Sequence, residues 1–195
     1  MSHDDHKEQL TRYLAVAREA MLWKLDGLSE YDVRRPMVPT GTNLLGLIKH
    51  LANVEAGYFG ATFNRPFDGP IIDWDTTTDE TLDMWANESE SRADIVDLYR
   101  DVCAHADTTI AELPLDASGR VPWWPEERAE ATLHRLLVHV VAETNRHAGH
   151  ADIVRELIDG GIGLRADGTN LPDWAAGEWA AYRERLEQAA RSAGG

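Results

Sequence analysis

Cysteine is nearly absent from this chain, which holds Cys103 alone among its 195 residues. A single cysteine excludes an internal disulfide framework and a cysteine-rich zinc finger. Basic residues are also scarce, because 19 lysines and arginines stand against 34 acidic residues and give a formal charge of −15. Nucleic acids and anionic membrane surfaces are bound by clustered Lys and Arg. The charge balance therefore argues against a partner of either kind.

Long apolar runs are lacking as well. No stretch approaches the roughly 18 residues that indicate a membrane span. Residues 1–6 are polar, so we expect no signal peptide. With almost no cysteine and no targeting segment, we expect a cytoplasmic protein that does not bind membranes.

Helical periodicity is what the sequence does contain. Apolar residues recur every three or four positions in four long segments, at about residues 4–25, 43–58, 88–113 and 130–158. No segment shows convincing alternation, so strands are expected to be absent or marginal. Four helices of this length predict an all-α protein built as a four-helix bundle.

The connections between these helices are unusual. The loop from Arg65 to Trp85 is longer than packing alone requires. A short extra helix is expected from Asp173 to about Ala190. We therefore predict that residues 1–163 form the bundle and that residues 164–195 form a C-terminal extension. The aromatic residues of this extension favour packing on the flank of the bundle or on a second subunit, which makes a homodimer the expected state.

The last long helix carries an acid and a histidine on its apolar side. At about 100° per residue, His147 lies in the middle of the apolar stripe, and Glu143 lies one turn earlier on the same side. A carboxylate that faces a helix bundle core is costly unless it is paired or bound to a metal. The pair is either a buried hydrogen bond or part of a metal site, and the further histidines nearby, His139 and His150 among them, give the two interpretations equal weight.

A third ligand must come from another helix. His50 borders the apolar stripe of the second long helix, and together with Glu143 and His147 it completes a set of two histidines and one carboxylate. Three protein ligands with an open position are typical of catalytic zinc, and the same set suits iron(II). A histidine at such a position can also be an ordinary packed residue.

Other polar and aromatic residues lie near these three in the sequence. His150, His139 and Asn53 are candidates for orienting the ligands. For Asn53 and the neighbouring Glu55, a solvated helix face is the simpler interpretation. Trp123 and Trp124, with Arg146, are candidates for the wall of a substrate pocket, although the tryptophans could equally be a structural plug. Cys103 is expected to belong to the core.

Three motifs resemble a known group of proteins. They are Gly-Thr-Asn-Leu-Leu-Gly-Leu-Ile-Lys-His-Leu at 41–51, Pro-Trp-Trp-Pro at 122–125 and Glu-Thr-Asn-Arg-His-Ala-Gly-His-Ala-Asp at 143–152. The chain resembles the DinB-like superfamily of metal-binding four-helix bundles over about residues 8–160. The nearest resemblance is to its branch of mycothiol transferases and proteins similar to mycothiol-dependent maleylpyruvate isomerase. Many superfamily members use three histidines, whereas Glu143 replaces one of them here, as in the isomerase.

The resemblance implies a DinB-like bundle whose ligands are His50, Glu143 and His147. It also implies a divalent metal, zinc first and nickel or iron(II) next, and a low-molecular-weight thiol such as mycothiol as cosubstrate. The expected activity is transfer of that thiol to an electrophilic small molecule. Two alternatives stay open: a metal-dependent hydrolase that uses a metal-bound water, and a non-catalytic metal-binding bundle. The sequence identifies no catalytic residue beyond the ligands.

Overall fold

The computed structural model describes residues 3–166 and 171–194 of the chain. Its elements follow in the order α1 (His3–Trp23), α2 (Glu30–Arg34), α3 (Leu44–Glu55), the π-helical turn η1 (Ala56–Gly60), the 3-10 turn η2 (Ala61–Phe63), α4 (Arg92–Glu112), β1 (Ser118–Arg120), α5 (Glu126–Ala129), β2 (Glu130–Thr132), α6 (Leu133–Asp159) and α7 (Ala176–Ala193). The described residues are mostly helical, as expected, with one sheet in which β1 and β2 pair antiparallel. None of the helices described is both long and apolar enough for a membrane span.

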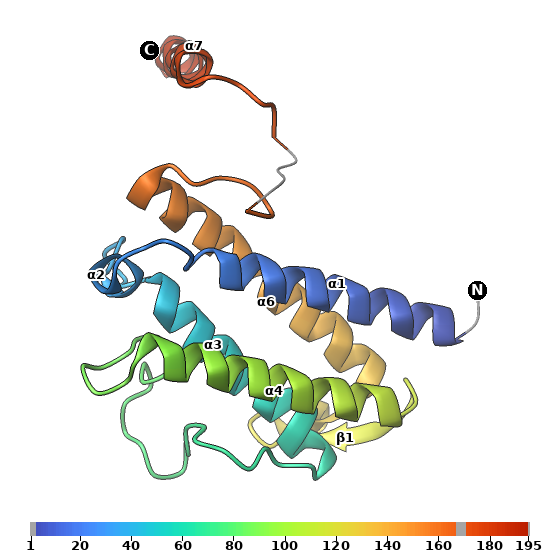
Figure 1. The fold of residues 1–195 in the computed structure, drawn as a ribbon. Helices are drawn as coiled ribbons and strands as arrows, with labels where there is room; N and C mark the ends of the chain where they lie inside the picture. Colours follow the sequence, from blue (N-terminus) through green and yellow to red (C-terminus); the bar gives the residue numbers. More distant parts are fainter. Residues whose placement is uncertain (1–2, 167–170, 195) are drawn as a thin grey trace.

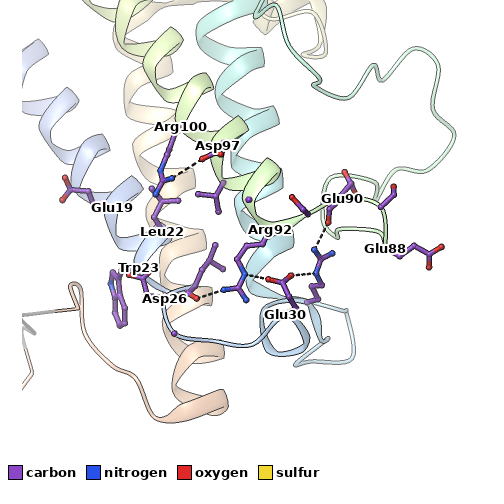
Figure 2. Close-up of a pocket in the computed structure, with 17 residues that line it drawn as sticks. Glu19, Leu22, Trp23, Asp26, Glu30, Glu88, Glu90, Arg92, Asp97 and Arg100 are labelled. Atoms are coloured by element: carbon purple, nitrogen blue, oxygen red, sulfur yellow. Dashed lines mark hydrogen bonds and ion pairs between the residues drawn. The ribbon is translucent and has the colours of Figure 1, made fainter.

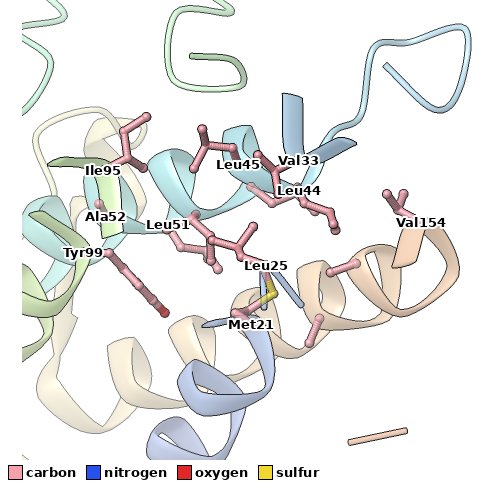
Figure 3. Packing of buried hydrophobic residues seen from close by; sticks show 14 residues of the cluster. Met21, Leu25, Val33, Leu44, Leu45, Leu51, Ala52, Ile95, Tyr99 and Val154 are labelled. Atoms are coloured by element: carbon pink, nitrogen blue, oxygen red, sulfur yellow. The ribbon is translucent and has the colours of Figure 1, made fainter. Parts of the chain in front are cut away.

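The four long helices lie side by side. Helix α1 packs along α6, α3 packs along α4, and α3 also contacts α6 (Figure 1). Their apolar faces meet in a core of two clusters of buried residues, one of which is shown in Figure 3. Buried residues from all four helices contribute to that cluster, among them Met21, Leu51, Tyr99 and Val154. The periodicity in the sequence therefore identified most of the buried positions, although Tyr13 on α1 and Leu157 on α6, which share the apolar spacing, are exposed.

Polar caps fix where the helices begin and end. Asn43 precedes α3 as expected, and its side chain accepts a hydrogen bond from the Gly46 amide at 2.8 Å. Helix α4 begins at Arg92 rather than near residue 88, because Ser91 caps it by accepting from the Asp94 amide. Helix α6 ends at Gly160, whose φ of 80° is the left-handed conformation that favours glycine. The short helices α2 and α5 were not expected from the sequence.

A buried ion pair links three helices at the centre of the protein. Arg18 on α1 makes two hydrogen bonds with Glu55 on α3, one of them 2.9 Å long, and a third with Asp107 on α4 at 2.7 Å. Glu55 is fully buried, so its assignment to a solvated helix face was wrong. Cys103 packs against the core as expected, and its thiol lies 3.8 Å from Glu55. Burial, followed by the Glu55 charge, raises the pKa of this thiol.

The segment that follows α6 is hydrogen-bonded to the end of α1 before the chain continues to α7. The Trp23 indole donates to the carbonyl of Leu164 at 2.8 Å, and the Lys24 ammonium donates to the carbonyl of Gly163 at 2.7 Å. Helix α7 then stands apart and has no buried residue (Figure 1). Residues 1–2 of the predicted domain 1–163 lie outside the described residues. So do residues 167–170 and 195 of the predicted extension 164–195.

Removing residues 171–195 should leave a folded, helical, metal-binding core with a changed oligomeric state or lower solubility. The reason is that α7 buries none of its residues, while Trp179 and Tyr182 on α7 and Trp174 just before it contact one another. Circular dichroism and light scattering after size exclusion would measure this. Global unfolding of the truncated chain would contradict the boundary and place the segment in the main body.

Candidate metal centre

His50 on α3 and the pair Glu143 and His147 on α6 come together between the two helices. The Nε2 atoms of both histidines face the same oxygen of Glu143, at 3.0 Å for His147 and 3.6 Å for His50. The three residues can each offer one donor atom within 4.8 Å of the others. The centroids of the two imidazole rings are also 4.8 Å apart. The sequence therefore selected three residues that the fold brings into one compact group.

The exposure of these side chains differs across the group. His147 is buried, while Glu143 and His50 are half-buried. Glu143 and His147 are separated by one turn of α6, so both side chains project toward α3. The His147 side of the group is thus packed between helices, while the side formed by Glu143 and His50 remains accessible to a small molecule.

Asp83 is a further member of the site that sequence reasoning missed. Its carboxylate accepts a hydrogen bond from the Nδ1–H of His50 at 2.6 Å, and Asp83 itself is buried. It lies in the irregular segment 64–91 between η2 and α4, where helical periodicity gives no information about contacts. Because a carboxylate only accepts, the proton of a neutral His50 resides on Nδ1 and its Nε2 lone pair faces Glu143 and His147.

Charge and burial shift the pKa values of the three residues. Burial opposes protonation of His50, but hydrogen bonds and charge from Asp83 and Glu143 outweigh it and raise its pKa. Burial and the neighbouring charge of His50 lower the pKa of His147. Burial would raise the pKa of Glu143, yet its contacts with His147 and His50 lower it overall. Near neutral pH, Glu143 is therefore ionised and His147 is neutral, as ligands must be.

Of the other histidines expected near the site, one lies beside the group and one does not touch it. His150 is exposed, and its Nδ1 lies 3.4 Å from the Nδ1 of His147. His139 lies one turn before Glu143, but its Nε2 is hydrogen-bonded with the hydroxyl of Tyr58 at 3.0 Å. His150 thus remains a candidate for orienting His147, whereas His139 belongs to a neighbouring aromatic cluster.

That aromatic cluster centres on Tyr58 in the π-helical turn. The indoles of Trp124 and Trp123 donate to its hydroxyl at 3.1 and 3.4 Å. Gly57 allows this approach, because a Cβ there would lie 2.7 Å from the ring of Trp123. Trp123 nevertheless remains 51% exposed. The cluster lies about one helical turn, or roughly 6 Å, along α6 from Glu143, and Tyr58 had not been singled out from the sequence.

Two remaining candidates occupy other places. Asn53 accepts from the amide of Ile72 at 2.8 Å and donates to the carbonyl of Lys49 at 2.9 Å, so it binds backbone rather than His50. Arg146 is exposed on α6, on the turn between Glu143 and His147. Asn53 therefore anchors the irregular segment 64–91 to α3. Arg146 is a surface cation near the His-Glu-His group.

The donor set is suited to a divalent metal. Zinc accepts imidazole nitrogen and carboxylate oxygen, and catalytic zinc sites use three protein ligands and keep one position open. Two histidines and one carboxylate also suit iron(II). The atoms that would hold the ion are the Nε2 atoms of His50 and His147 and a carboxylate oxygen of Glu143, which already face one another.

Zinc affinity should fall as the pH drops, beginning at a higher pH than for an ordinary histidine ligand. The raised pKa of His50 means that this ring takes up a proton earlier on acidification, and a protonated ring cannot bind metal. Titration of zinc binding between about pH 8 and pH 5 measures the effect. An affinity that stays constant over this range would exclude histidine ligation.

A separate cleft lies between the end of α1, α2 and the start of α4. It encloses about 960 Å³, and none of the three donor residues lines it (Figure 2). Arg92 donates to the carbonyls of Leu25 and Leu28, and Arg34 donates to the carbonyls of Asn87 and Glu90. These arginines stabilise the connections between helices, so we assign them a structural role.

A mostly helical protein with a His-Glu-His group between two long helices is the class that the fold and the site define. Over residues 9–160, the chain matches the family described as MST, mycothiol-S-transferase. The match extends from within α1 to the end of α6, and the chain therefore belongs to this family. The resemblance noted in the sequence is thereby confirmed. A search of curated proteins finds no match.

Proposed function

We propose that this protein is a metal-dependent S-transferase that joins a low-molecular-weight thiol, such as mycothiol, to electrophilic small molecules. The observation that carries the proposal is the convergence of His50, Glu143 and His147 on one point in a chain of the mycothiol-S-transferase family. A divalent ion, zinc in the first place, would be held there by these three residues. When bound, such an ion lowers the pKa of a coordinated thiol, so that the nucleophilic thiolate is available near neutral pH.

The residues of the chain contribute charge and orientation to this chemistry. Ionised Glu143 offsets one of the two charges of a divalent ion, so one formal positive charge remains to attract a thiolate. His50 and His147 supply neutral nitrogen donors. The partial exposure of Glu143 and His50 provides the side from which the thiol would approach.

The substrate wall is proposed to consist of the aromatic cluster and its nearest cation. Trp123 offers an exposed ring face about one turn of α6 from Glu143, and Trp124 closes the cluster behind it. Arg146 would attract an anionic group on either substrate. We further propose that α1, α3, α4 and α6 are the four helices of a DinB-like bundle, that residues 164–195 form a separate extension, and that the extension contributes to a homodimer.

The proposal is tested by incubating the zinc-loaded protein with mycothiol and monochlorobimane. The expected product is the fluorescent bimane–mycothiol adduct with release of chloride, formed faster than without protein. The rate should fall to the background level in the metal-free protein and in His147→Ala, and it should be unchanged in His134→Ala, whose exposed histidine lies outside the group. Equal rates with and without protein for mycothiol and for other cellular thiols would refute the proposal. Ester or amide hydrolysis by the same preparation would then favour the hydrolase.

Changes at Glu143 should separate its charge from its role as a ligand. Glu143→Gln should weaken zinc binding, because a neutral amide is a poorer ligand than a carboxylate. Glu143→His should retain zinc, and it should lower the pH at which the bound thiol ionises, because the site then keeps two formal positive charges. The pH–rate profile of thiol transfer measures the shift. Full zinc occupancy and an unchanged profile in Glu143→Gln would show that Glu143 is not a ligand.

A further inference from the structure

The long irregular segment 64–91 is fastened along one face of α3. Residues of this face are spaced by three or four positions, so they form a single row on the helix. Three of them bond to the backbone of the segment: Asn43 donates to the carbonyl of Met84 at 3.0 Å, Lys49 donates to that of Trp85 at 3.1 Å, and Asn53 accepts from the amide of Ile72 at 2.8 Å. A loop of this length is therefore held in place by side chains of α3.

Gly46 belongs to the same row and explains the close approach of the segment. A Cβ at this position would lie 1.9 Å from the carbonyl oxygen of Met84, so any larger residue must displace the loop backbone. Lys49 is buried and also pairs with Glu90 at 2.8 Å, which ties the far end of the segment to α3. The row thus holds the residues that flank Asp83.

His50 lies in this row, and Asp83 is the residue of the segment that contacts it. The contact joins the Nδ1–H of His50 to a buried carboxylate at 2.6 Å. It leaves the opposite nitrogen of the ring facing Glu143. A partner on the outer nitrogen of a metal-binding histidine fixes both its tautomer and its ring orientation.

We propose that the row Asn43, Gly46, Lys49 and Asn53 is a receiving face for the segment 64–91, and that Asp83 is thereby a positioning residue that orients His50 for metal binding. This inference rests on the proposed metal site. It assigns a role to Asn43, Gly46 and Lys49 of the motif at 41–51, none of which belongs to the His-Glu-His group. It also explains the length of the connection, since the chain must run back along α3, from Asn53 near its end to Asn43 at its start, before α4 begins.

Zinc affinity, measured alone by competition with a chromophoric chelator, tests the proposal. Asp83→Ala should weaken zinc binding by about 10- to 100-fold, the usual loss when such a partner is removed. Asp83→Asn should retain more affinity than Asp83→Ala, because an amide oxygen still accepts the Nδ1 proton. Asp75→Asn is the matched control: Asp75 lies in the same segment, is exposed and should leave the affinity unchanged. Wild-type affinity in Asp83→Ala would overturn the proposal.

Gly46→Ala tests whether the α3 row acts through Asp83. It should weaken zinc binding although it touches no ligand, and it should add little in the Asp83→Ala background, because the two changes act on one contact. Fully additive losses would overturn the claim that the row positions Asp83. Thermal unfolding of each metal-free variant separates this effect from a general loss of stability.

A readout without metal distinguishes this inference from the proposed function. In the metal-free protein at a pH above the pKa of His50, the nitrogen chemical shifts of His50 should show a protonated Nδ1 and an unprotonated Nε2. Asp83→Ala should shift the ring toward the other tautomer, while Asp75→Asn should not. If His50 keeps the same tautomer in Asp83→Ala, the positioning role fails, whatever the outcome of the thiol transfer assay. If the tautomer changes but no thiol is transferred, only the proposed function fails.

Discussion

His147→Ala and His50→Ala should each lose most of the zinc that the wild-type protein binds, while His134→Ala should keep it. In the proposed site His147 and His50 would each supply one of three donors, and a divalent ion held by two protein ligands exchanges readily with solvent and chelators. His134 is exposed on α6, so it provides the same substitution on the same helix without a ligand role. Zinc content after dialysis against a mild chelator, measured by elemental analysis, gives the comparison.

Equal zinc content in the three variants would remove these histidines from the site. Zinc loss with all three would instead point to a general effect of the substitution on α6 or α3. Circular dichroism of the metal-free forms distinguishes these cases, because it reports whether a variant has lost helical structure.

Breaking the buried ion pair between Arg18 and Glu55 should be the most destabilising single change away from the metal group. Arg18→Ala leaves the charge of fully buried Glu55 uncompensated in the interior, which costs about 3–5 kcal/mol, whereas Glu55→Ala leaves Arg18 its contact with Asp107 and should cost less. The exposed pair Arg100 and Asp97 is the control, because Arg100→Ala should cost less than about 1 kcal/mol. Urea unfolding monitored by circular dichroism measures both.

The comparison of Arg18→Ala with Arg100→Ala also tests whether the Arg18–Glu55 ion pair stabilises the core. Similar losses for Arg18→Ala and Arg100→Ala would show that the interior around Glu55 admits water and that the pair contributes little. A large loss in Arg18→Ala with zinc affinity retained in the folded fraction would support its assignment to the structure of the core, where it joins α1, α3 and α4.

The long helices and the His-Glu-His group were predictable because both depend on helical periodicity. The spacing of Glu143 and His147 relative to the apolar residues of α6 was enough to place them on one face, and the same reasoning placed His50 at the edge of the core. These are local consequences of a 3.6-residue repeat. Family resemblance then selected His50 from the other histidines, and the fold brings all three together.

Asp83 and Tyr58 could not be predicted in the same way. Asp83 lies in an irregular segment, and the path of this segment depends on contacts with the side chains of α3. A single aspartate between Leu82 and Met84 belongs to no periodic pattern, so the sequence gives no indication of its contact with His50. Tyr58 lies in a π-helical turn, which shifts side-chain directions away from those of an α-helix. Glu55 was misassigned because its buried partner, Arg18, is distant in the sequence.

Anomalous diffraction at the zinc absorption edge, from crystals of the zinc-loaded protein, tests the central claim most directly. We expect one strong peak between α3 and α6, within bonding distance of the Nε2 atoms of His50 and His147 and of a carboxylate oxygen of Glu143. A peak elsewhere, or no peak between these three residues in a protein that elemental analysis shows to contain zinc, would contradict it.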